Sequence, residues 1–218
     1  MKIYCASDFH IGYEDANYPK MKEFFELVKE NADELILCGD VLDLWRCPIE
    51  TIISQEPMKS TYEALLSMTE EVPTTIVWGN HDYKLWKKVK IPVQVTDSFV
   101  SNNTYYCHGW RFDIQQMFGH WLYGWLVDQF PYLYQKFIKT PFELKIEDKN
   151  YRLRIEKIHE KAREFIKKEG LDYLIMGHTH EPVGDDGKLF DCGDMIDSFT
   201  YVIIEDGRPR LEKMPGND

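Results

Sequence analysis

The chain has 218 residues, of which 44% are hydrophobic, and this length is enough for one domain with a sizeable core. Its formal net charge is −11 at pH 7. Such a surface repels a phosphate backbone and argues against general nucleic-acid binding. No uncharged run reaches the roughly 18 residues that a membrane span requires. The first polar cluster begins at Asp8 and leaves no room for a signal peptide, so a cytoplasmic protein is expected.

The five cysteines form no Cys-x-x-Cys pair, and their odd number does not suit a complete set of disulfides. Four of them stand in or beside apolar runs that are typical of strands. We therefore expect reduced thiols in the core of a protein from a reducing compartment. The cysteines are Cys5, Cys38, Cys47, Cys107 and Cys192.

The first part of the chain alternates predicted strands with predicted helices. Apolar runs indicate strands over residues 2–7, 34–38 and 73–78. Helical periodicity over 19–30, and a proline at the start of 57–70, indicate two intervening helices. Strand–helix–strand units of this kind predict a mostly parallel sheet in an α/β fold.

Short strands separated by turns are predicted for much of the remaining chain. A different segment, at about 110–169, interrupts this pattern. Its second part, 143–169, is strongly charged and predicted to be helical. The further predicted strands lie near 98–100 and over 103–107, 171–176, 188–192, 199–205 and 209–213.

A polar cluster follows five of the predicted strands. In open α/β sheets, ligands gather beyond the carboxyl ends of the strands. We therefore expect these clusters to converge, although they span about 170 residues of sequence. The clusters are Asp8-Phe9-His10, Gly39-Asp40, Gly79-Asn80-His81-Asp82, His108-Gly109 and Gly177-His178-Thr179-His180.

The clusters supply two Asp, one Asn and four His as candidate metal ligands, and no Cys. Seven O and N donors are too few for two separate sites, but they suit two divalent ions that share a bridging carboxylate. Asp40 is the natural bridge, because Gly39 before it allows a close approach. Mixed O and N ligation favours Mn, with Fe, Zn or Ni as alternatives, over Cu(I).

Two clusters contain candidate ligands that are separated by one residue. Residues i and i+2 of a strand point to the same face, so Asp8 and His10 are expected to grip one ion together. By the same argument, His178 and His180 share a face and offer one imidazole to each ion. This pattern predicts a dinuclear hydrolase.

The five clusters and their order resemble the signature motifs of the calcineurin-like metallophosphoesterase superfamily. The resemblance covers residue 3 to about residue 205, outside the segment at about 110–169. It implies a single domain over 1–218, with an α/β fold in which a sandwich of two mixed β-sheets is flanked by helices (αββα). The segment 110–169 would be a helical and aromatic cap insertion over the site.

The resemblance also implies the ligands of each metal ion. The first ion would be bound by Asp8, His10, Asp40 and His180. The second ion would be bound by Asp40, Asn80, His108 and His178. In the mechanism so implied, a hydroxide that bridges the ions attacks phosphorus in line.

Two further roles follow from the same resemblance. His81 would donate a hydrogen bond or a proton to the phosphate or to the leaving oxygen. Asp43 stands three residues after the bridging Asp40 and would orient His81.

Within the superfamily, several stretches resemble UDP-2,3-diacylglucosamine hydrolases and their relatives. Two positions depart from those enzymes. His81 stands where they typically carry Arg, and Trp110 stands where the fourth motif commonly has a second His. Superfamily chemistry is therefore expected, and the specificity for a lipid is left open. The similar stretches are Gly39 to Trp45, His108 to Asp113, Asp191 to Asp194 ahead of Asp197-Ser198, and the aromatic insertion.

Aromatic residues crowd the stretch 117–137 within the insertion. One expectation is that this aromatic stripe binds an acyl chain or contacts a membrane surface peripherally. The alternative is that it forms the hydrophobic core of the insertion. Arg46, close to the Asp40 loop, and His120, within the stripe, are candidate substrate contacts. His159 is expected to be a solvated helix residue.

The leading hypothesis is a metal-dependent phosphoesterase that hydrolyses a phosphodiester or pyrophosphate bond of a small molecule, either lipid-linked or nucleotide-linked. Alternatives in the same superfamily are a phosphomonoesterase, including a protein phosphatase, and a nuclease. The least favoured alternative is a non-catalytic scaffold, because scaffolds usually lose ligands or the catalytic His and this chain retains all of them. The sequence does not indicate an oligomeric state.

Overall fold

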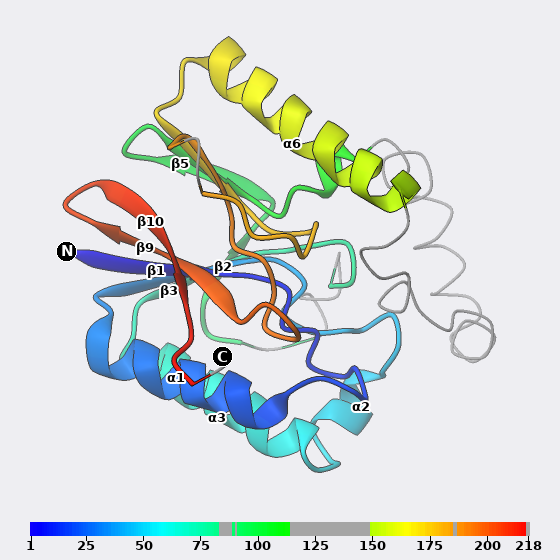
Figure 1. Ribbon diagram of the computed structural model, residues 1–218. Coiled ribbons are helices and arrows are strands. Elements are labelled where there is room, and N and C mark those ends of the chain that lie inside the picture. The colour runs from blue at the N-terminus through cyan, green and yellow to red at the C-terminus, as the bar shows by residue number, and fades with distance from the viewer. Residues whose placement is uncertain (83–88, 90, 114–148, 185–186, 217–218) are drawn as a thin grey trace.

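The computed structural model describes residues 1–82, 89, 91–113, 149–184 and 187–216. Two β-sheets pack face to face, and helices cover the outer face of each sheet, so the described chain forms four layers (Figure 1). This arrangement confirms the predicted α/β sandwich of two mixed sheets flanked by helices.

The larger sheet has six strands in the order β10-β9-β1-β2-β3-β4. Strands β1 to β4 are parallel to one another, and β9 pairs antiparallel with both β1 and β10. The strands are β1 (Lys2–Ala6), β2 (Glu34–Cys38), β3 (Thr74–Val77), β4 (Gln94–Thr96), β9 (Thr200–Glu205) and β10 (Arg208–Lys213).

The smaller sheet has four strands in the order β5-β6-β7-β8. Strands β6, β7 and β8 are parallel, and β5 is antiparallel to β6. The five polar clusters follow the carboxyl ends of β1, β2, β3, β6 and β7, so both sheets contribute to one edge of the sandwich. The strands are β5 (Ser98–Ser101), β6 (Thr104–Cys107), β7 (Tyr173–Met176) and β8 (Leu189–Asp191).

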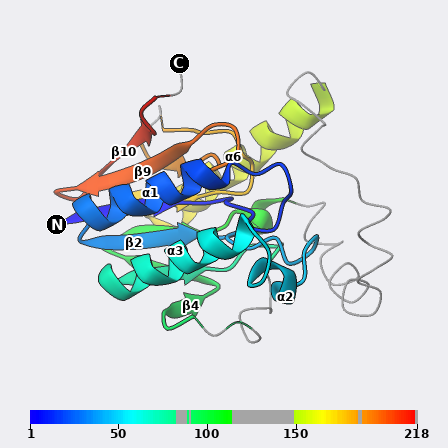
Figure 2. The same cartoon turned by 90° about the horizontal axis from the view of Figure 1, so that it is seen from below.

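Helices α1 (Tyr18–Asn31) and α3 (Met58–Glu71) lie side by side on the outer face of the larger sheet (Figure 2). Helix α1 begins after Asn17, whose side chain accepts a hydrogen bond from the backbone N–H of Lys20. A single turn, α2 (Ile49–Ile52), precedes α3. The buried face of α1 has the helical spacing that its sequence predicts, and it consists of Tyr18, Lys20, Met21, Phe24, Phe25 and Val28.

The side chains of β1 alternate between two cores. Tyr4 and Ala6 face the helices, whereas Ile3 and Cys5 face the smaller sheet. Strand β2 alternates in the same way. Because both faces of these strands are buried, their sequences are nearly continuous apolar runs.

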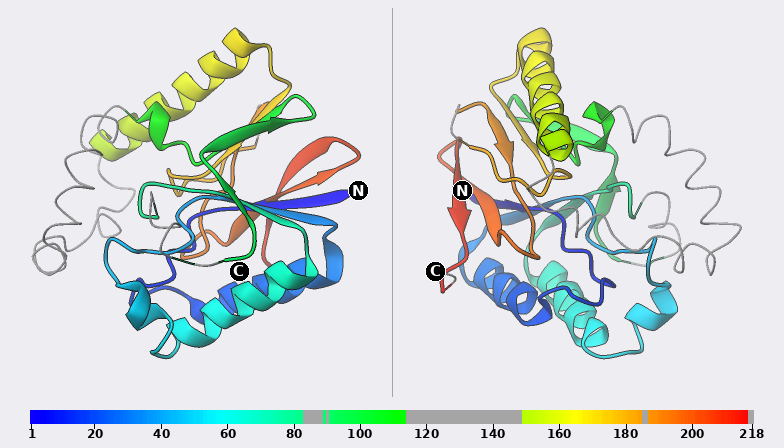
Figure 3. Two further views of the ribbon diagram at one scale, coloured as in Figure 1. Left: turned by 180° about the vertical axis from the view of Figure 1, so that it is seen from behind. Right: turned by 45° about the vertical axis from the view of Figure 1, so that its right-hand side comes forward.

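Helix α6 (Lys149–Glu169) covers the outer face of the smaller sheet, opposite to α1 and α3 (Figure 3). Its buried residues Ile158, Ala162 and Ile166 pack with Leu174 of β7 and Leu189 of β8. These residues were predicted to belong to the insertion over the site. In the structure this helix is the fourth layer of the sandwich, because one of its faces is apolar and buries itself against the sheet.

The predicted strands and helices are present within the described residues, with ends that differ by one or two positions. Strand β4, the turn α2 and the 3-10 helix η2 (Trp110–Phe112) were not predicted. Elements of three or four residues are too short to show a hydrophobic period.

All five cysteines are buried. Among the helices described, none is both long and apolar enough to cross a membrane.

Candidate metal centre

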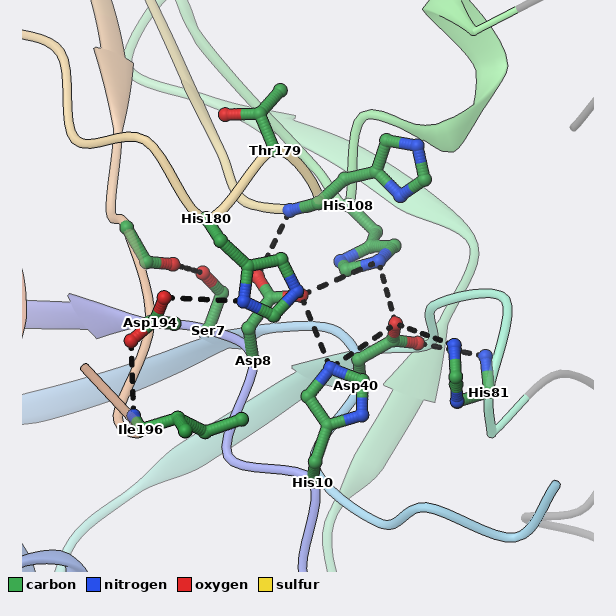
Figure 4. A network of polar contacts seen from close by, with 12 residues as sticks. Ser7, Asp8, His10, Asp40, His81, His108, Thr179, His180, Asp194 and Ile196 are labelled. Carbon is green, nitrogen blue, oxygen red and sulfur yellow. Dashed lines mark hydrogen bonds and ion pairs between the residues drawn. The ribbon is translucent and has the colours of Figure 1, made fainter. Parts of the chain in front are cut away.

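Side chains of the polar clusters meet in one region (Figure 4), and left-handed backbone conformations are concentrated among these residues. Nine non-glycine residues in the described part of the chain have a positive φ, and five of them are predicted metal ligands. Each such residue costs on the order of 1–3 kcal/mol, and such residues typically gather at functional sites. The five ligands are Asp8, His10, Asp40, His178 and His180.

Asp8 and His10 were predicted to converge through the pleat of a strand, and this prediction is wrong. Strand β1 ends at Ala6, and φ values of 55° and 48° turn the two residues toward one another in the following loop. His178 and His180 follow β7 in the same way, with φ values of 83° and 60°. In both loops, left-handed turns rather than strand alternation set the positions of the predicted ligands.

Two glycines, in the loops that follow β2 and β3, allow neighbouring ligand side chains to come close to the backbone. Gly39 has a φ of +93°, and a Cβ atom there would lie 2.4 Å from Nδ1 of His108. A Cβ atom on Gly79 would lie 2.1 Å from Oδ1 of Asp40. A side chain at either position would therefore displace a predicted ligand.

Oδ1 of Asp8 lies among three imidazoles. Its distance to Nε2 is 3.3 Å for His180, 3.6 Å for His10 and 3.9 Å for His108. Within the described residues, this buried oxygen and Nε2 of His108 make no hydrogen bond. Buried polar atoms of this kind are costly unless another group, such as a cation, satisfies them.

Asp40 occupies the position predicted for the bridge. Its Oδ1 accepts a hydrogen bond of 2.8 Å from the backbone N–H of His81. Its Oδ2 lies 3.2 Å from Nε2 of His108 and 3.7 Å from Nε2 of His10. One carboxylate oxygen is therefore fixed by the backbone, and the other faces ligands that were predicted for different ions.

The two remaining predicted ligands, Asn80 and His178, lie against each other. Nδ1 of His178 is 3.0 Å from Oδ1 of Asn80. The backbone N–H of His178 donates a hydrogen bond of 2.9 Å to Oδ2 of Asp8. The rings of His108 and His178 meet edge to face, with centroids 5.2 Å apart. The structure thus brings all seven predicted ligands into one region.

This set of donors fits divalent metal ions. In each of three groups of the described residues, the ligand atoms lie within 4.8 Å of one another. Because Asp8, His10 and Asp40 each belong to two groups, the groups form one continuous cluster. Carboxylate and imidazole ligands without thiolate suit Mn, Fe or Zn. The groups are Asp8–His10–His180, His10–Asp40–His81 and Asp8–Asp40–His108.

Opposite charges control the protonation of the cluster. Burial lowers the pKa of His10 and of His108, but neighbouring carboxylates raise both pKa values to about 10. Burial raises the pKa of Asp8, but His180 and His108 lower it to about 2. In the same way, His108 lowers the pKa of Asp40 against the effect of burial. The metal-free cluster therefore holds protons on imidazoles at neutral pH, and a metal ion would replace them.

Each of the four ligand histidines has its second ring nitrogen against a fixed acceptor. Such contacts set the tautomer and the ring orientation of metal-binding histidines. Asp43 was predicted to orient His81, and no contact with a ligand histidine was predicted for Asp113 or Asp194. The need of every ligand histidine for an acceptor is the signal that could have identified them. The pairs are His10 Nδ1 with Asp43 (3.3 Å), His108 Nδ1 with the Cys38 carbonyl (2.7 Å), His178 Nε2 with Asp113 (3.2 Å) and His180 Nδ1 with Asp194 (3.1 Å).

His81 lies at the edge of the cluster, with Nε2 4.0 Å from Oδ2 of Asp40. Its Nδ1 is 2.9 Å from Oδ1 of Asp43, which is the contact expected of an orienting carboxylate. Trp45 stacks on the imidazole, with ring centroids 4.3 Å apart and 28° between the planes. The ring is therefore held by a carboxylate and an indole, while Nε2 faces the ligands.

Asp43 is fully buried and has several partners. Its Oδ2 contacts Nδ1 of His10 and the guanidinium of Arg46. Burial raises the pKa of Asp43, but His81 and His10 hold it well below its usual value. The guanidinium of Arg46 also lies 5.2 Å from the ring centroid of Tyr13. The structure thus places Arg46 against Asp43, and its contact with substrate stays a prediction.

His159 is buried, so the expectation of a solvated residue was wrong. Its Nε2 lies 3.0 Å from Oδ2 of Asp191, which also accepts a hydrogen bond of 2.7 Å from the hydroxyl of Thr179. These contacts connect α6 with the loop that carries His178 and His180. The prediction failed because the charged composition of the helix does not reveal which face is packed.

Two predictions concern residues that the structure does not describe. His120, a candidate substrate contact, and the aromatic stripe 117–137, a candidate lipid surface, both lie outside the described residues. Their roles stay predictions.

A comparison with protein-family models matches residues 1–182 to the family described as calcineurin-like phosphoesterase. The chain belongs to this family. It is a metal-dependent phosphoesterase whose buried Asp/His cluster fits a dinuclear metal site. A comparison with curated proteins gives no match.

Solved structures of phosphoesterases resemble the fold. The phosphoesterase YfcE from E. coli is 17% identical, with a TM-score of 0.47 over 94% of this chain and 89% of that chain. A metallophosphoesterase from Sphaerobacter thermophilus is 13% identical, with a TM-score of 0.48 over 100% of this chain and 90% of that chain. A dimetal phosphatase from Danio rerio is 12% identical, with a TM-score of 0.45 over 97% and 98%.

Proposed function

We propose that this protein hydrolyses a phosphodiester or pyrophosphate bond of a small molecule at a site that binds two divalent metal ions. The observation that carries the proposal is the convergence of seven O and N donors from five loops, with His81 beside them. Mn is the proposed metal, with Fe, Zn or Ni as alternatives. The proposed ligands are Asp8, His10, Asp40 and His180 for the first ion, and Asp40, Asn80, His108 and His178 for the second.

When bound, two such ions lower the pKa of coordinated water and offset the charge on phosphoryl oxygens. Asp40 would be a ligand that the two ions share. Its Oδ1 is fixed by the backbone, and its Oδ2 faces His10 and His108, which are proposed for different ions. His81 would donate through Nε2 to the phosphate or the leaving oxygen. Asp43 accepts from Nδ1–H of His81, which directs Nε2 toward the ligands.

A small substrate is favoured over nucleic acid because the formal net charge of −11 repels a polyanion. Trp45, stacked on His81, offers an aromatic face at the edge of the site, which suits a planar or apolar leaving group. Arg46 nearby offers a cation for a second phosphate. These features support a nucleotide-linked or lipid-linked substrate, as the resemblance to UDP-2,3-diacylglucosamine hydrolases also suggests. Peripheral membrane contact through 117–137 and a cytoplasmic location are part of the same proposal.

The test compares Mn²⁺-dependent hydrolysis of bis-p-nitrophenyl phosphate with that of p-nitrophenyl phosphate. EDTA treatment and the variant Asp40→Asn are the controls. Metal-dependent turnover that favours the diester would support the proposal and justify nucleotide-sugar lipids as the next substrates. A preference for the monoester would change the assignment to a phosphomonoesterase. Protein that binds two ions and cleaves neither ester would contradict a general phosphodiesterase.

A further inference from the structure

Asp113 connects the second predicted metal site with helix α6. Its side chain is buried, and its Oδ2 lies 3.2 Å from Nε2 of His178. The same oxygen accepts hydrogen bonds from Nε of Arg154, at 3.1 Å, and from Nη2 of Arg154. One buried carboxylate oxygen therefore joins an arginine of the outer helix to a histidine of the metal centre.

The contact with Asp113 decides which nitrogen of His178 is available to a metal ion. An ionised carboxylate only accepts hydrogen bonds, so the facing Nε2 carries a hydrogen atom. In the neutral ring, Nδ1 then retains its lone pair. Nδ1 lies 3.0 Å from Oδ1 of Asn80, which is also an acceptor. In this tautomer no hydrogen atom lies between the two acceptors, so both would be available to a metal ion.

Arg154 belongs to a well-packed part of the fold. The apolar face of α6 packs on the smaller sheet, and Lys161 of the same helix donates a hydrogen bond of 3.1 Å to the carbonyl oxygen of Phe112. Phe112 immediately precedes Asp113, so α6 holds both the backbone and the side chain of this region. The two N–H donors of a guanidinium orient the carboxylate and offset the cost of burying its charge.

We propose that Asp113 and Arg154 are positioning residues for the second metal ion, because the pair holds His178 in the tautomer and orientation in which Nδ1 is the ligand atom. The inference rests on the proposed dinuclear site. The second nitrogens of His10 and His180, which are assigned to the first ion, lie against other carboxylates. Loss of the Asp113–Arg154 pair is therefore expected to weaken the binding of the second ion and to leave the binding of the first ion unchanged.

The test titrates metal-free protein with Mn²⁺ in a calorimeter and counts the bound metal by elemental analysis. The wild-type protein is expected to bind two ions. Asp113→Ala is expected to bind the first ion with unchanged affinity and the second roughly 10–100-fold more weakly. Arg154→Met is expected to lower the affinity for the same ion. The matched control Arg210→Met, which removes an arginine that pairs with two glutamates at the far edge of the larger sheet, is expected to match the wild type.

The electron paramagnetic resonance spectrum of bound Mn²⁺ gives a readout that is independent of activity. Two adjacent ions in the wild type are expected to give an exchange-coupled signal, which Asp113→Ala replaces with the signal of an isolated ion. If Asp113→Ala is unfolded by circular dichroism, Asp113→Asn takes its place, because asparagine preserves the shape and loses the charge. Its loss of affinity is expected to be smaller and confined to the same ion.

If these variants lose affinity for both ions to the same extent, the inference is overturned, but the proposal of a dinuclear site is not. Wild-type affinity for both ions in Asp113→Ala would overturn it in the same way. A wild-type protein that binds fewer than two ions would overturn the proposed dinuclear function itself, and the inference with it.

Discussion

At the scale of single residues, Asp43 shows how one carboxylate can serve two parts of a site. Its Oδ1 contacts the proposed catalytic His81, and its Oδ2 contacts the proposed ligand His10. In the proposed mechanism, metal binding and proton donation would therefore depend on the same side chain. The family resemblance assigned Asp43 to His81 by its distance in sequence from Asp40. The contact with His10 became known only from the structure.

His81→Ala is expected to retain two metal ions and to lower kcat by roughly 10²–10⁴-fold, because the variant loses only a general acid. Metal content by elemental analysis and kinetics with bis-p-nitrophenyl phosphate measure the two effects separately. His81 also belongs to one group of potential ligand atoms with His10 and Asp40. Loss of one ion in this variant would therefore show that His81 is a ligand.

Metal affinity is expected to rise with pH between about 6 and 9, because metal ions compete with protons at the ligand imidazoles. The pKa values of His10 and His108 are raised to about 10, so both rings are protonated at neutral pH in the metal-free protein. Asp8, with a pKa lowered to about 2, stays ionised over the whole range and adds no dependence. Calorimetry in two buffers of different ionisation enthalpy measures the released protons. An affinity that does not change with pH would contradict the assigned protonation.

At the scale of elements, helix α6 shows the limit of reading a charged segment. The residues between 143 and 169 are mostly polar, and the sequence analysis placed them above the site. In the structure, Ile158, Ala162 and Ile166 form a buried stripe, and His159 lies buried beside them. The stripe is visible in the sequence, but nothing local shows which surface it packs against.

His159→Leu is expected to lower the free energy of unfolding by about 1–3 kcal/mol, because Asp191 loses a hydrogen-bond partner in a buried position. The hydroxyl of Thr179 and the backbone N–H of Gly193 remain as donors to Asp191. Urea denaturation of the metal-free protein measures the change. Lys157→Leu, at an exposed position of the same helix, is the control. Equal stability of the two variants would contradict a structural role for the buried contact.

At the scale of the whole molecule, the centre exists only because two sheets pack face to face and the ligand loops of both lie at the same edge of the sandwich. The loops that follow β1, β2 and β3 of the larger sheet supply Asp8, His10, Asp40 and Asn80, and the loops that follow β6 and β7 of the smaller sheet supply the remaining predicted ligands. Strained backbone and paired charges are concentrated at this junction. Bound metal would offset part of this cost.

Mn²⁺ is expected to raise the melting temperature of the metal-free protein. A free ion concentration of 100 times Kd adds about 2.7 kcal/mol, which corresponds to about 5–10 °C for a domain of this size. Thermal denaturation with and without EDTA measures the shift. Asp40→Asn, which loses the shared ligand, is expected to show a much smaller shift. A wild-type melting temperature that does not respond to metal would contradict the site.

Apolar runs and residue identities are local properties, so most of the strands, the five polar clusters and their order could be predicted from the sequence, and with them the fold class and the family resemblance. The way in which the ligands converge, and the contacts that hold them, follow from tertiary packing. The left-handed turns at Asp8 and His178 depend on packing rather than on the strand period. The contact of His178 with Asp113 joins residues 65 positions apart, and that of Asp113 with Arg154 joins residues 41 apart. Such contacts follow from the packing of α6 on the smaller sheet, which no local pattern specifies.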